Sequence, residues 1–302
     1  MTNNSVISNL HIVNWPVHLF AIQTSSDVIL KDMLLDNRDG EAPNSRSDGL
    51  AAAHNSDGYG VKESSNILIT NNKVYNQDDC VAVTSGNNIT IDGLYCSGGH
   101  GLSIGSVGGK SNNNVTNILF TNTDVVNSTN GPRIKSNFNT TGYIANITYS
   151  NIRLSNITDY GIDVQQDYLN GGPNGTPSNG VIIANVLFKN VAHFIHPEPD
   201  HFGTEILAIA LKLNSHHFLD HQPACSEDGP VRNQATVLLS NYGSSPSWCV
   251  ENIGITENER RSTAYLVKAA VLFVLSIVVQ VFVIITIYST ASTYYERSYY
   301  RS

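Results

Sequence analysis

One type of short segment recurs along the first two thirds of this 302-residue chain. Each copy opens with Asn or Asp and continues as an alternating strand rich in Ile, Val, Leu, Phe and Tyr. The copies are NLHIVNW at residue 9, DVILKDMLL at 27, NILITNNKV at 66, NITIDGLYC at 88, NILFTNTDVV at 117, NITYSNIRL at 146 and NVLFKNV at 185. Their starts lie 18–39 residues apart, and such spacings indicate a solenoid. Because no 10–15-residue amphipathic helices separate the strands, the sequence predicts an all-β parallel β-helix.

The Asn at a fixed place on each coil has a physical use in this fold. Stacked side-chain amides can hydrogen-bond to one another along the axis of a solenoid. We therefore expect Asn88 and Asn146 to be ladder positions rather than glycan sites, although both begin sequons. The eight sequons start at Asn3, Asn88, Asn114, Asn127, Asn139, Asn146, Asn156 and Asn174.

Charged residues make up only 14% of the chain, compared with about 25% in typical soluble proteins. The net charge of −8 argues against non-specific nucleic-acid binding, which needs a basic face. A polyanionic ligand is still compatible with this charge if basic residues gather locally. A polar, weakly charged surface predicts a secreted, extracellular protein. The start MTNNSVISNLHIVNW, however, has neither the basic nor the apolar region of a signal peptide.

The stretch NQDDCVAVTSG places two acids, Asp78 and Asp79, at the start of an apolar strand. Asp79 lies nine residues before the ladder residue Asn88, and Asp57 lies nine residues before Asn66. The segments DGYGV, DCVAV and HGLSI share one pattern, with apolar side chains at the third and fifth places. Because stacked strands lie about 4.8 Å apart, we expect Asp57, Asp79 and His100 to stack, with Asp78 beside them.

The segment GPRIKSN follows one coil later and brings Arg133 and Lys135 towards the same face. Three carboxylates this close cannot all ionise normally, so at least one pKa should rise. Such a cluster suits general acid–base chemistry. An Asp at a coil corner can also simply cap a turn, which would be the better explanation for a lone Asp57. The coincidence of acids, His100 and two cations in one register favours a functional site over a set of turn caps.

Four short motifs carry a family resemblance. QDDC at 77–80, GGHG at 98–101 and RIK at 133–135 match the family fully, and NSDG at 55–58 differs only in having Ser where Thr is usual. QQDY at 165–168 matches a further family segment. Over residues 5–192 the chain resembles the polygalacturonases of glycoside hydrolase family 28, most closely the fungal-type endopolygalacturonases. The resemblance implies a right-handed parallel β-helix that hydrolyses α-1,4-linked galacturonan, the backbone of pectin, with inversion.

The resemblance also implies a role for each matching residue. Asp78 would be the general acid, and Asp57 and Asp79 would hold and deprotonate the attacking water. His100 would support the protonation state of the acid. The substrate-binding residues would be Arg133, Lys135, Tyr168 and Asn55. The cations would pair with galacturonate carboxylates.

The resemblance further pairs Cys80 with Cys96 and implies neither metal nor cofactor. The expected partner is pectin polysaccharide, bound by a monomer. Pro132 replaces the usual aliphatic residue before RIK. Because proline fixes φ and removes a donor, we expect some displacement of Arg133. By comparison with the family, we expect this sequence to lack the first coils and the N-terminal cap.

The remaining chain departs from the family. The sequence predicts a catalytic β-helix domain over residues 1–192 and a divergent or irregular segment over 193–263. Residues 269–288 are a mostly apolar run of twenty residues with no charge and one Gln, long enough to span about 30 Å of hydrocarbon. They predict a transmembrane helix within 264–290, followed by a short polar tail at 291–302. Aromatic residues on the C-terminal side suit a membrane interface. The pairing of Cys225 and Cys249 is left open.

The sequence thus predicts an endo-acting polygalacturonase with a three-aspartate mechanism. An exo-acting or rhamnogalacturonan-directed hydrolase is the nearest enzymatic alternative, because the loops that close the groove decide between them. The alternative from another class is a non-catalytic carbohydrate-binding β-helix or an inactive, truncated paralogue.

Overall fold

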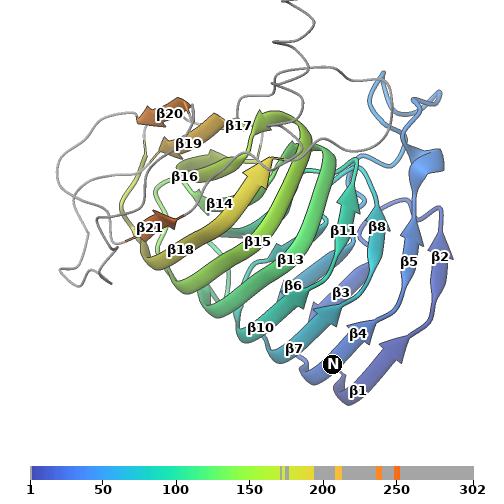
Figure 1. Ribbon diagram of the computed structural model, residues 1–302, viewed down its shortest axis with the longest axis horizontal. Helices are drawn as coiled ribbons and strands as arrows, with labels where there is room; N and C mark the ends of the chain where they lie inside the picture. The colour runs from blue at the N-terminus through green and yellow to red at the C-terminus, as the bar shows by residue number, and fades with distance from the viewer. Residues whose placement is uncertain are drawn as a thin grey trace, which may run out of the picture. The chain divides into compact units, whose positions relative to one another are not determined.

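The computed structural model describes residues 2–170, 172–173, 177–193, 208–212, 236–239 and 248–251. Within these residues the strands stack side by side as successive coils, from β1 at the N-terminus to β18 (Figure 1). Their pairing is parallel throughout, apart from one short antiparallel contact between β16 and β17. The predicted all-β parallel β-helix is confirmed.

The coils build two parallel sheets. Strands of the first, twelve-stranded sheet are β1 (Asn3–Ser8), β2 (His11–Val13), β4 (Ser26–Lys31), β5 (Leu34–Asp36), β7 (Ser64–Thr70), β8 (Lys73–Tyr75), β10 (Gly86–Asp92), β11 (Tyr95–Ser97), β13 (Asn114–Asn130), β15 (Gly142–Tyr160), β18 (Val181–His193) and β21 (Trp248–Glu251). Strands of the second, nine-stranded sheet are β3 (Phe20–Gln23), β6 (Tyr59–Lys62), β9 (Val81–Val83), β12 (Leu102–Val107), β14 (Pro132–Asn137), β16 (Ile162–Leu169), β17 (Gly172–Pro173), β19 (Ala208–Lys212) and β20 (Thr236–Leu239). A single turn of 3₁₀ helix, η1 (Arg38–Gly40), is the one helix among the described residues.

The interior is filled by stacks of like side chains from successive coils. Phe120, Tyr149 and Phe188 are in register on β13, β15 and β18. Their rings are stacked, with centroids 4.7 and 5.3 Å apart, and all three are fully buried. Because side chains alternate between faces along a strand, each coil sends every second residue into this core and leaves the others outside.

The predicted asparagine ladder runs along the outside of the first sheet. Asn88 Nδ2 donates to Asn66 Oδ1 at 2.8 Å, and Asn146 Nδ2 donates to Asn117 Oδ1 at 3.0 Å. The amide of Asn185 donates in turn to Asn146 at 3.1 Å. These residues all have φ of 52–58°, the left-handed region that Asn tolerates better than most residues. Asn therefore serves both the turn of the backbone and the ladder, and the predicted ladder positions of Asn88 and Asn146 are confirmed.

Cys80 and Cys96 form the predicted disulfide. It joins the start of β9 to β11 and so ties the segment that carries Asp78 and Asp79 to the other sheet. Cys225 lies outside the described residues, as does the predicted transmembrane helix at 264–290. No helix among the described residues is both long and apolar enough to cross a membrane. The predicted domain boundaries stay predictions.

The ladder predicts an ordered effect of substitutions at Asn146. Asn146→Gly keeps the freedom to adopt positive φ and loses only the amide contacts. Asn146→Ala loses the amide contacts and also disfavours positive φ. We expect Asn146→Ala to lower the free energy of unfolding by about 1–2 kcal/mol, and Asn146→Gly by less. Urea denaturation of the two variants beside the wild type measures this. Equal stability of the Ala and Gly variants would contradict a requirement for the left-handed backbone.

Candidate active site

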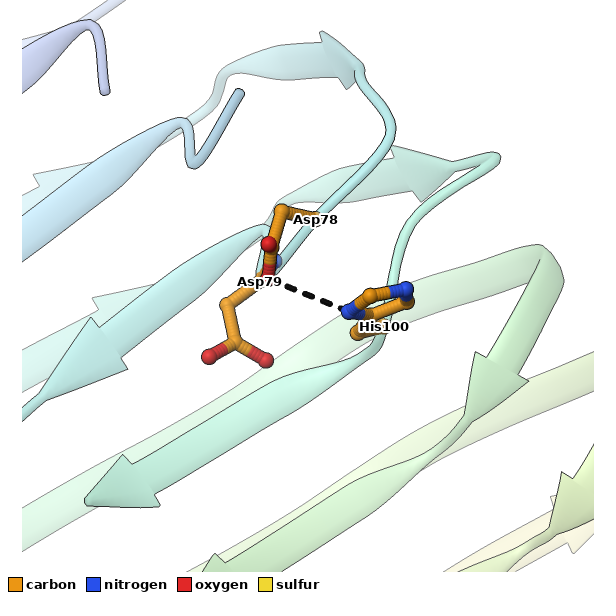
Figure 2. Close-up of side chains that lie close together, drawn as sticks. All are labelled: Asp78, Asp79 and His100. Carbon is orange, nitrogen blue, oxygen red and sulfur yellow. Dashed lines mark hydrogen bonds and ion pairs between the residues drawn. The ribbon is translucent and has the colours of Figure 1, made fainter. Parts of the chain in front are cut away.

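The register of the second sheet brings the predicted acids together. Tyr59 of β6 pairs with Val81 of β9, which pairs with Leu102 of β12. The residues two places earlier, Asp57, Asp79 and His100, therefore enter their strands at equal height on three successive coils. Asp78 precedes Asp79 and turns towards His100 (Figure 2). The structure thus gathers all four residues for which acid–base roles were expected.

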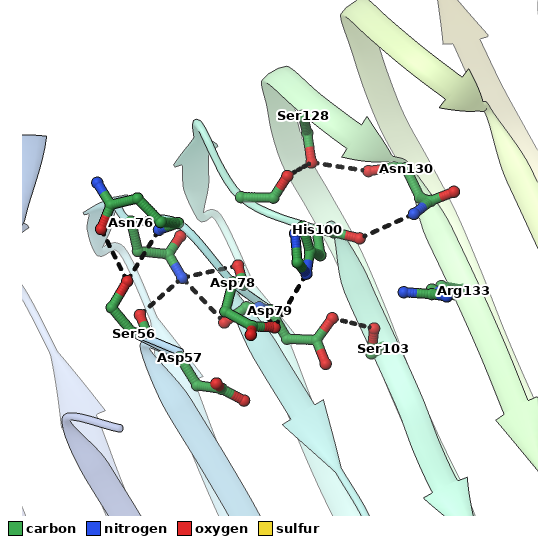
Figure 3. A network of polar contacts seen from close by, with 12 residues as sticks. Ser56, Asp57, Asn76, Asp78, Asp79, His100, Ser103, Ser128, Asn130 and Arg133 are labelled. Carbon is green, nitrogen blue, oxygen red and sulfur yellow. Dashed lines mark hydrogen bonds and ion pairs between the residues drawn. The ribbon is translucent and has the colours of Figure 1, made fainter. Parts of the chain in front are cut away.

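Each of the two adjacent aspartates has its own donors (Figure 3). His100 Nδ1 lies 3.1 Å from Asp78 Oδ1, and the backbone N–H of Asp79 donates to the same oxygen at 2.7 Å. Asp79 accepts from Ser103 Oγ at 2.6 Å and from Lys135 Nζ at 2.7 Å, one to each oxygen. Asp79 and Lys135 are both buried. Asp78 and Asp79 are therefore held in different directions despite being neighbours in sequence.

The turn that carries these acids is fixed by Asn76. Its Nδ2 donates to three carbonyl oxygens, those of Ser56, Asp78 and Asp79, at 3.0, 2.8 and 3.1 Å. Gly99 of the neighbouring coil packs directly over this turn, and a Cβ there would clash with the carbonyl oxygen of Asp78. The glycine beside His100 thus permits the close approach of two coils, which brings the imidazole within reach of Asp78.

Asp57 is the third carboxylate, and it is also buried. Its Oδ1 lies 3.0 Å from Nδ1 of His18, an exposed histidine one coil earlier. The preceding residue, Ser56, is buried and its Oγ donates to Gln77 Oε1 at 2.8 Å. Asn55 is exposed, and its backbone bridges to Val17. The NSDG motif therefore presents one buried acid, one structural hydroxyl and one surface amide.

Burial and neighbouring charges give Asp57 and Asp78 different pKa values. Burial, and then repulsion from Asp78 and Asp79, raises the pKa of Asp57 to about 7. Burial also disfavours the charge on Asp78, but the hydrogen bond and charge of His100 outweigh it, so the pKa of Asp78 lies below its ordinary value. The hydrogen bond to Asp78 raises the pKa of His100. At mildly acidic pH the cluster therefore holds protons on Asp57 and His100.

The predicted cations occupy the next coil. Arg133 lies opposite Ser103, and Lys135 lies opposite Gly105. Pro132 stands at the first position of β14, where a strand tolerates proline. The displacement of Arg133 expected from this proline stays a prediction. Tyr168 lies beside both cations: its ring centroid is 5.7 Å from the Arg133 guanidinium carbon and 5.4 Å from Lys135 Nζ.

A buried carboxylate, Asp163, accepts from Arg133 Nε at 3.1 Å. Gln165 Nε2 donates to the same oxygen at 2.5 Å. Asp163 is in register with Arg133 on the next coil, so it faces outwards from the same row of the sheet. The sequence reasoning missed Asp163, Ser103 and His18. Alternation along HGLSI could have found Ser103, because it is the outward residue between buried Leu102 and Ile104.

The ligand atoms of Asp78, Asp79 and His100 lie within 4.8 Å of one another, so these three side chains could geometrically hold a cation. Lys135 already supplies a positive charge at 2.7 Å from Asp79. An acidic cluster with its own ammonium partner is better suited to proton transfer than to metal binding.

The raised pKa of Asp57 predicts a pH-dependent stability. Since its folded pKa of about 7 exceeds the ordinary pKa of an aspartate, 3.8, the native state binds more protons than the unfolded state between these values. The free energy of unfolding should fall as pH rises from 4 towards 8, by up to about 4 kcal/mol from this group. Asp57→Asn should flatten this fall. Urea denaturation at pH 4.5, 6 and 8 measures it, with Asp124→Asn in the other sheet as control. Equal pH dependence in wild type and Asp57→Asn would contradict the assignment.

Comparison with known proteins adds to this geometry. The family model for glycosyl hydrolases family 28 matches residues 1–198. The chain is 57% identical over 199 residues to a probable endopolygalacturonase D of Emericella nidulans, covering 66% of this chain and 39% of that protein. It is 60% identical over 190 residues to a polygalacturonase of Fusarium fujikuroi, covering 63% of this chain and 51% of that protein. The chain therefore spans about half the length, or less, of these curated relatives.

Among solved structures, the polygalacturonase from Erwinia carotovora ssp. carotovora superposes with a TM-score of 0.55 at 19% identity, covering 84% of this chain and 54% of that chain. An endo-xylogalacturonan hydrolase from Aspergillus tubingensis superposes with a TM-score of 0.51 at 26% identity, covering 66% and 53%. The first likeness shows the β-helix fold. With the family model matched over 198 of the 302 residues, the chain belongs to glycosyl hydrolases family 28.

Proposed function

We propose that this chain hydrolyses α-1,4-galacturonosidic linkages of polygalacturonan, acting within the polymer. The observation that carries the proposal is the cluster of three buried or half-buried carboxylates, Asp57, Asp78 and Asp79. A histidine and two cations lie beside it on adjoining coils. The curated relatives are named as polygalacturonases and endopolygalacturonases, which supports the same substrate and mode of action here.

Asp78 and His100 form the proton source in this proposal. In the free site the proton resides on His100, hydrogen-bonded to Asp78 Oδ1. Bringing an anionic galacturonosyl unit into the site adds negative charge, which favours the protonated form of nearby carboxyls. The proton then moves from His100 to Asp78 and from Asp78 to the glycosidic oxygen as the bond from that oxygen to the anomeric carbon breaks.

Asp79 and Asp57 are the carboxylates that take up the proton lost by the attacking water. A water held between them attacks the anomeric carbon from the opposite side, forming the new carbon–oxygen bond and losing its proton to a carboxylate. Lys135 and Ser103 fix the orientation of Asp79, so its carboxylate has little freedom to rotate. The configuration at the anomeric carbon is inverted in this scheme.

Arg133, Lys135 and Tyr168 form the binding side of the proposed site. Asp163 engages the guanidinium of Arg133 at Nε, which leaves the terminal nitrogens as the edge that can pair with a uronate carboxylate. Lys135 is 7% exposed at its side chain and is already bound to Asp79, so we assign the ligand carboxylate primarily to Arg133. Asn55, exposed on the first coil of the site, would meet the polymer further along.

We infer that the protein acts outside the cell. Pectin is an extracellular polymer, and a disulfide such as Cys80–Cys96 persists in oxidising compartments. A monomer is sufficient, because all the proposed groups come from one chain. Membrane anchoring through residues 269–288 stays a prediction from the sequence.

Loss of Asp78 tests the proposed hydrolysis. Asp78→Asn keeps the shape of the side chain but removes its acidic proton, so reducing-end release from polygalacturonic acid at mildly acidic pH should fall about 10²–10⁴-fold. Asp124→Asn, on the other sheet, should keep full activity. Circular dichroism establishes that each variant is folded. A folded, inert wild type would favour a carbohydrate-binding β-helix, and early release of monomers only would favour an exo-acting enzyme.

Asp163 should affect binding more than turnover. Asp163→Asn removes the charge that holds Arg133, so the guanidinium loses its fixed direction while the acids are untouched. We expect KM for polygalacturonate to rise about tenfold, with kcat within about twofold of wild type. Steady-state kinetics measure both constants. A substitution away from Arg133, such as Gln166→Glu, does not test how Arg133 is positioned. A fall in kcat with unchanged KM would contradict the positioning role.

A further inference from the structure

His18 contacts the acid cluster and belongs to none of the family motifs of the sequence. It lies two residues before β3, which begins at Phe20, and one coil ahead of Asp57. The coil is held there by the backbone hydrogen bonds from Leu19 N to Asp57 O, at 2.9 Å, and from Phe20 N to Gly58 O, at 3.1 Å. Leu19 thus stands opposite Gly58, and His18 stands opposite Asp57. The contact between the two side chains, 3.0 Å from Nδ1 to Oδ1, follows from this register.

The three carboxylates differ in how they are supported. Asp79 accepts from Ser103 and Lys135, and Asp78 accepts from His100 and a backbone N–H. For Asp57, His18 is the one side-chain donor recorded among the described residues. The side chain of Asp57 is only 10% exposed, whereas that of His18 is 58% exposed. Water can therefore replace little of this contact at Asp57, although it surrounds much of the histidine.

The charged groups facing Asp57 come from three directions. Asp78 and Asp79, on the next coil, disfavour its ionisation, and His18 and Lys135 favour it. Lys135 is already paired with Asp79 at 2.7 Å, so its charge is largely compensated. His18 is consequently the neighbour that acts on Asp57 through a direct contact of its own.

We propose that His18 is a positioning residue for Asp57, which donates to the carboxylate through Nδ1 and so orients it and stabilises its ionised form. In the proposed reaction the ionised Asp57, populated as the pH approaches 7, accepts the proton of the attacking water. This rests on the proposed function only for the identity of that water. Both the neutral tautomer with a proton on Nδ1 and the imidazolium can donate in this geometry. Nε2 is not required for the contact, and the ring is accessible to solvent.

The ionisation of Asp57 can be measured without any activity. Full-length protein carrying ¹³Cγ-labelled aspartate is titrated by NMR, with the Asp57 resonance identified by its absence in Asp57→Asn. His18→Ala removes the donor, and the midpoint for Asp57 should move upwards by about half a unit or more, because the pair is partly exposed and weaker than a buried one. His11→Ala, in β2 of the other sheet, should leave the midpoint unchanged.

A second variant separates the hydrogen bond from loss of side-chain volume. His18→Asn can still place an amide donor near Asp57, so its midpoint should lie between those of wild type and His18→Ala. An unchanged midpoint in both His18 variants, or a downward shift, would overturn the proposal. Because His18 is exposed, both variants should fold, which circular dichroism verifies.

The kinetic consequence has its own readout. With active protein, the acidic limb of the pH profile of kcat/KM should move to higher pH in His18→Ala and stay in place in His11→Ala. A lower rate at every pH with an unmoved limb would overturn the role in ionisation. If the wild type releases no reducing ends, the proposed function fails, whereas the NMR titration still decides whether His18 controls Asp57.

Discussion

The constant register of neighbouring coils is the constraint on which the rest of the structure depends. Parallel strands about 4.8 Å apart place equivalent residues of successive coils in contact, both inside and outside the solenoid. Inside, this stacks Phe120, Tyr149 and Phe188. Outside, the same repetition aligns Asp57, Asp79 and His100 at the entry of three strands. A fold that gains stability from stacking like groups therefore also brings like charges together.

The site accommodates those charges by giving each carboxylate a different environment. Asp79 is matched by the buried ammonium of Lys135, and Asp78 by His100. Asp57 has the partner most open to water, and burial raises its pKa to about 7. Asp57 and Asp78, two acids with the same intrinsic pKa, thereby take up different protonation states, and such a difference separates proton donors from proton acceptors in general acid–base chemistry. The acid–base chemistry therefore depends on which side chain contacts each carboxylate, and not on the acids alone.

Much of this arrangement was predictable, because it depends on residues close in sequence to a strand start. The shared pattern of DGYGV, DCVAV and HGLSI set the register of the acids, and the Asn at each strand start set the ladder. Asp163 was not predicted, because it has no motif of its own and meets Arg133 only through the pairing of β14 with β16. His18 was missed because the loop around η1 separates it from Asp57 by 39 residues, so the coil length there could not be counted from the repeat.

The placement of Asp57 also shows how the fold supports an unfavourable group. A buried carboxyl with a raised pKa costs stability when it must ionise, and no ammonium group in the described part of the chain forms an ion pair with Asp57. The surrounding coils are nevertheless tightly determined: Asn76 bonds to three carbonyl oxygens of the adjoining turns, and the Cys80–Cys96 disulfide holds the next strand. Relaxation of Asp57 towards water would require moving these groups together. The local cost is therefore retained, as is common at functional sites, and it leaves Asp57 sensitive to a change in one exposed neighbour.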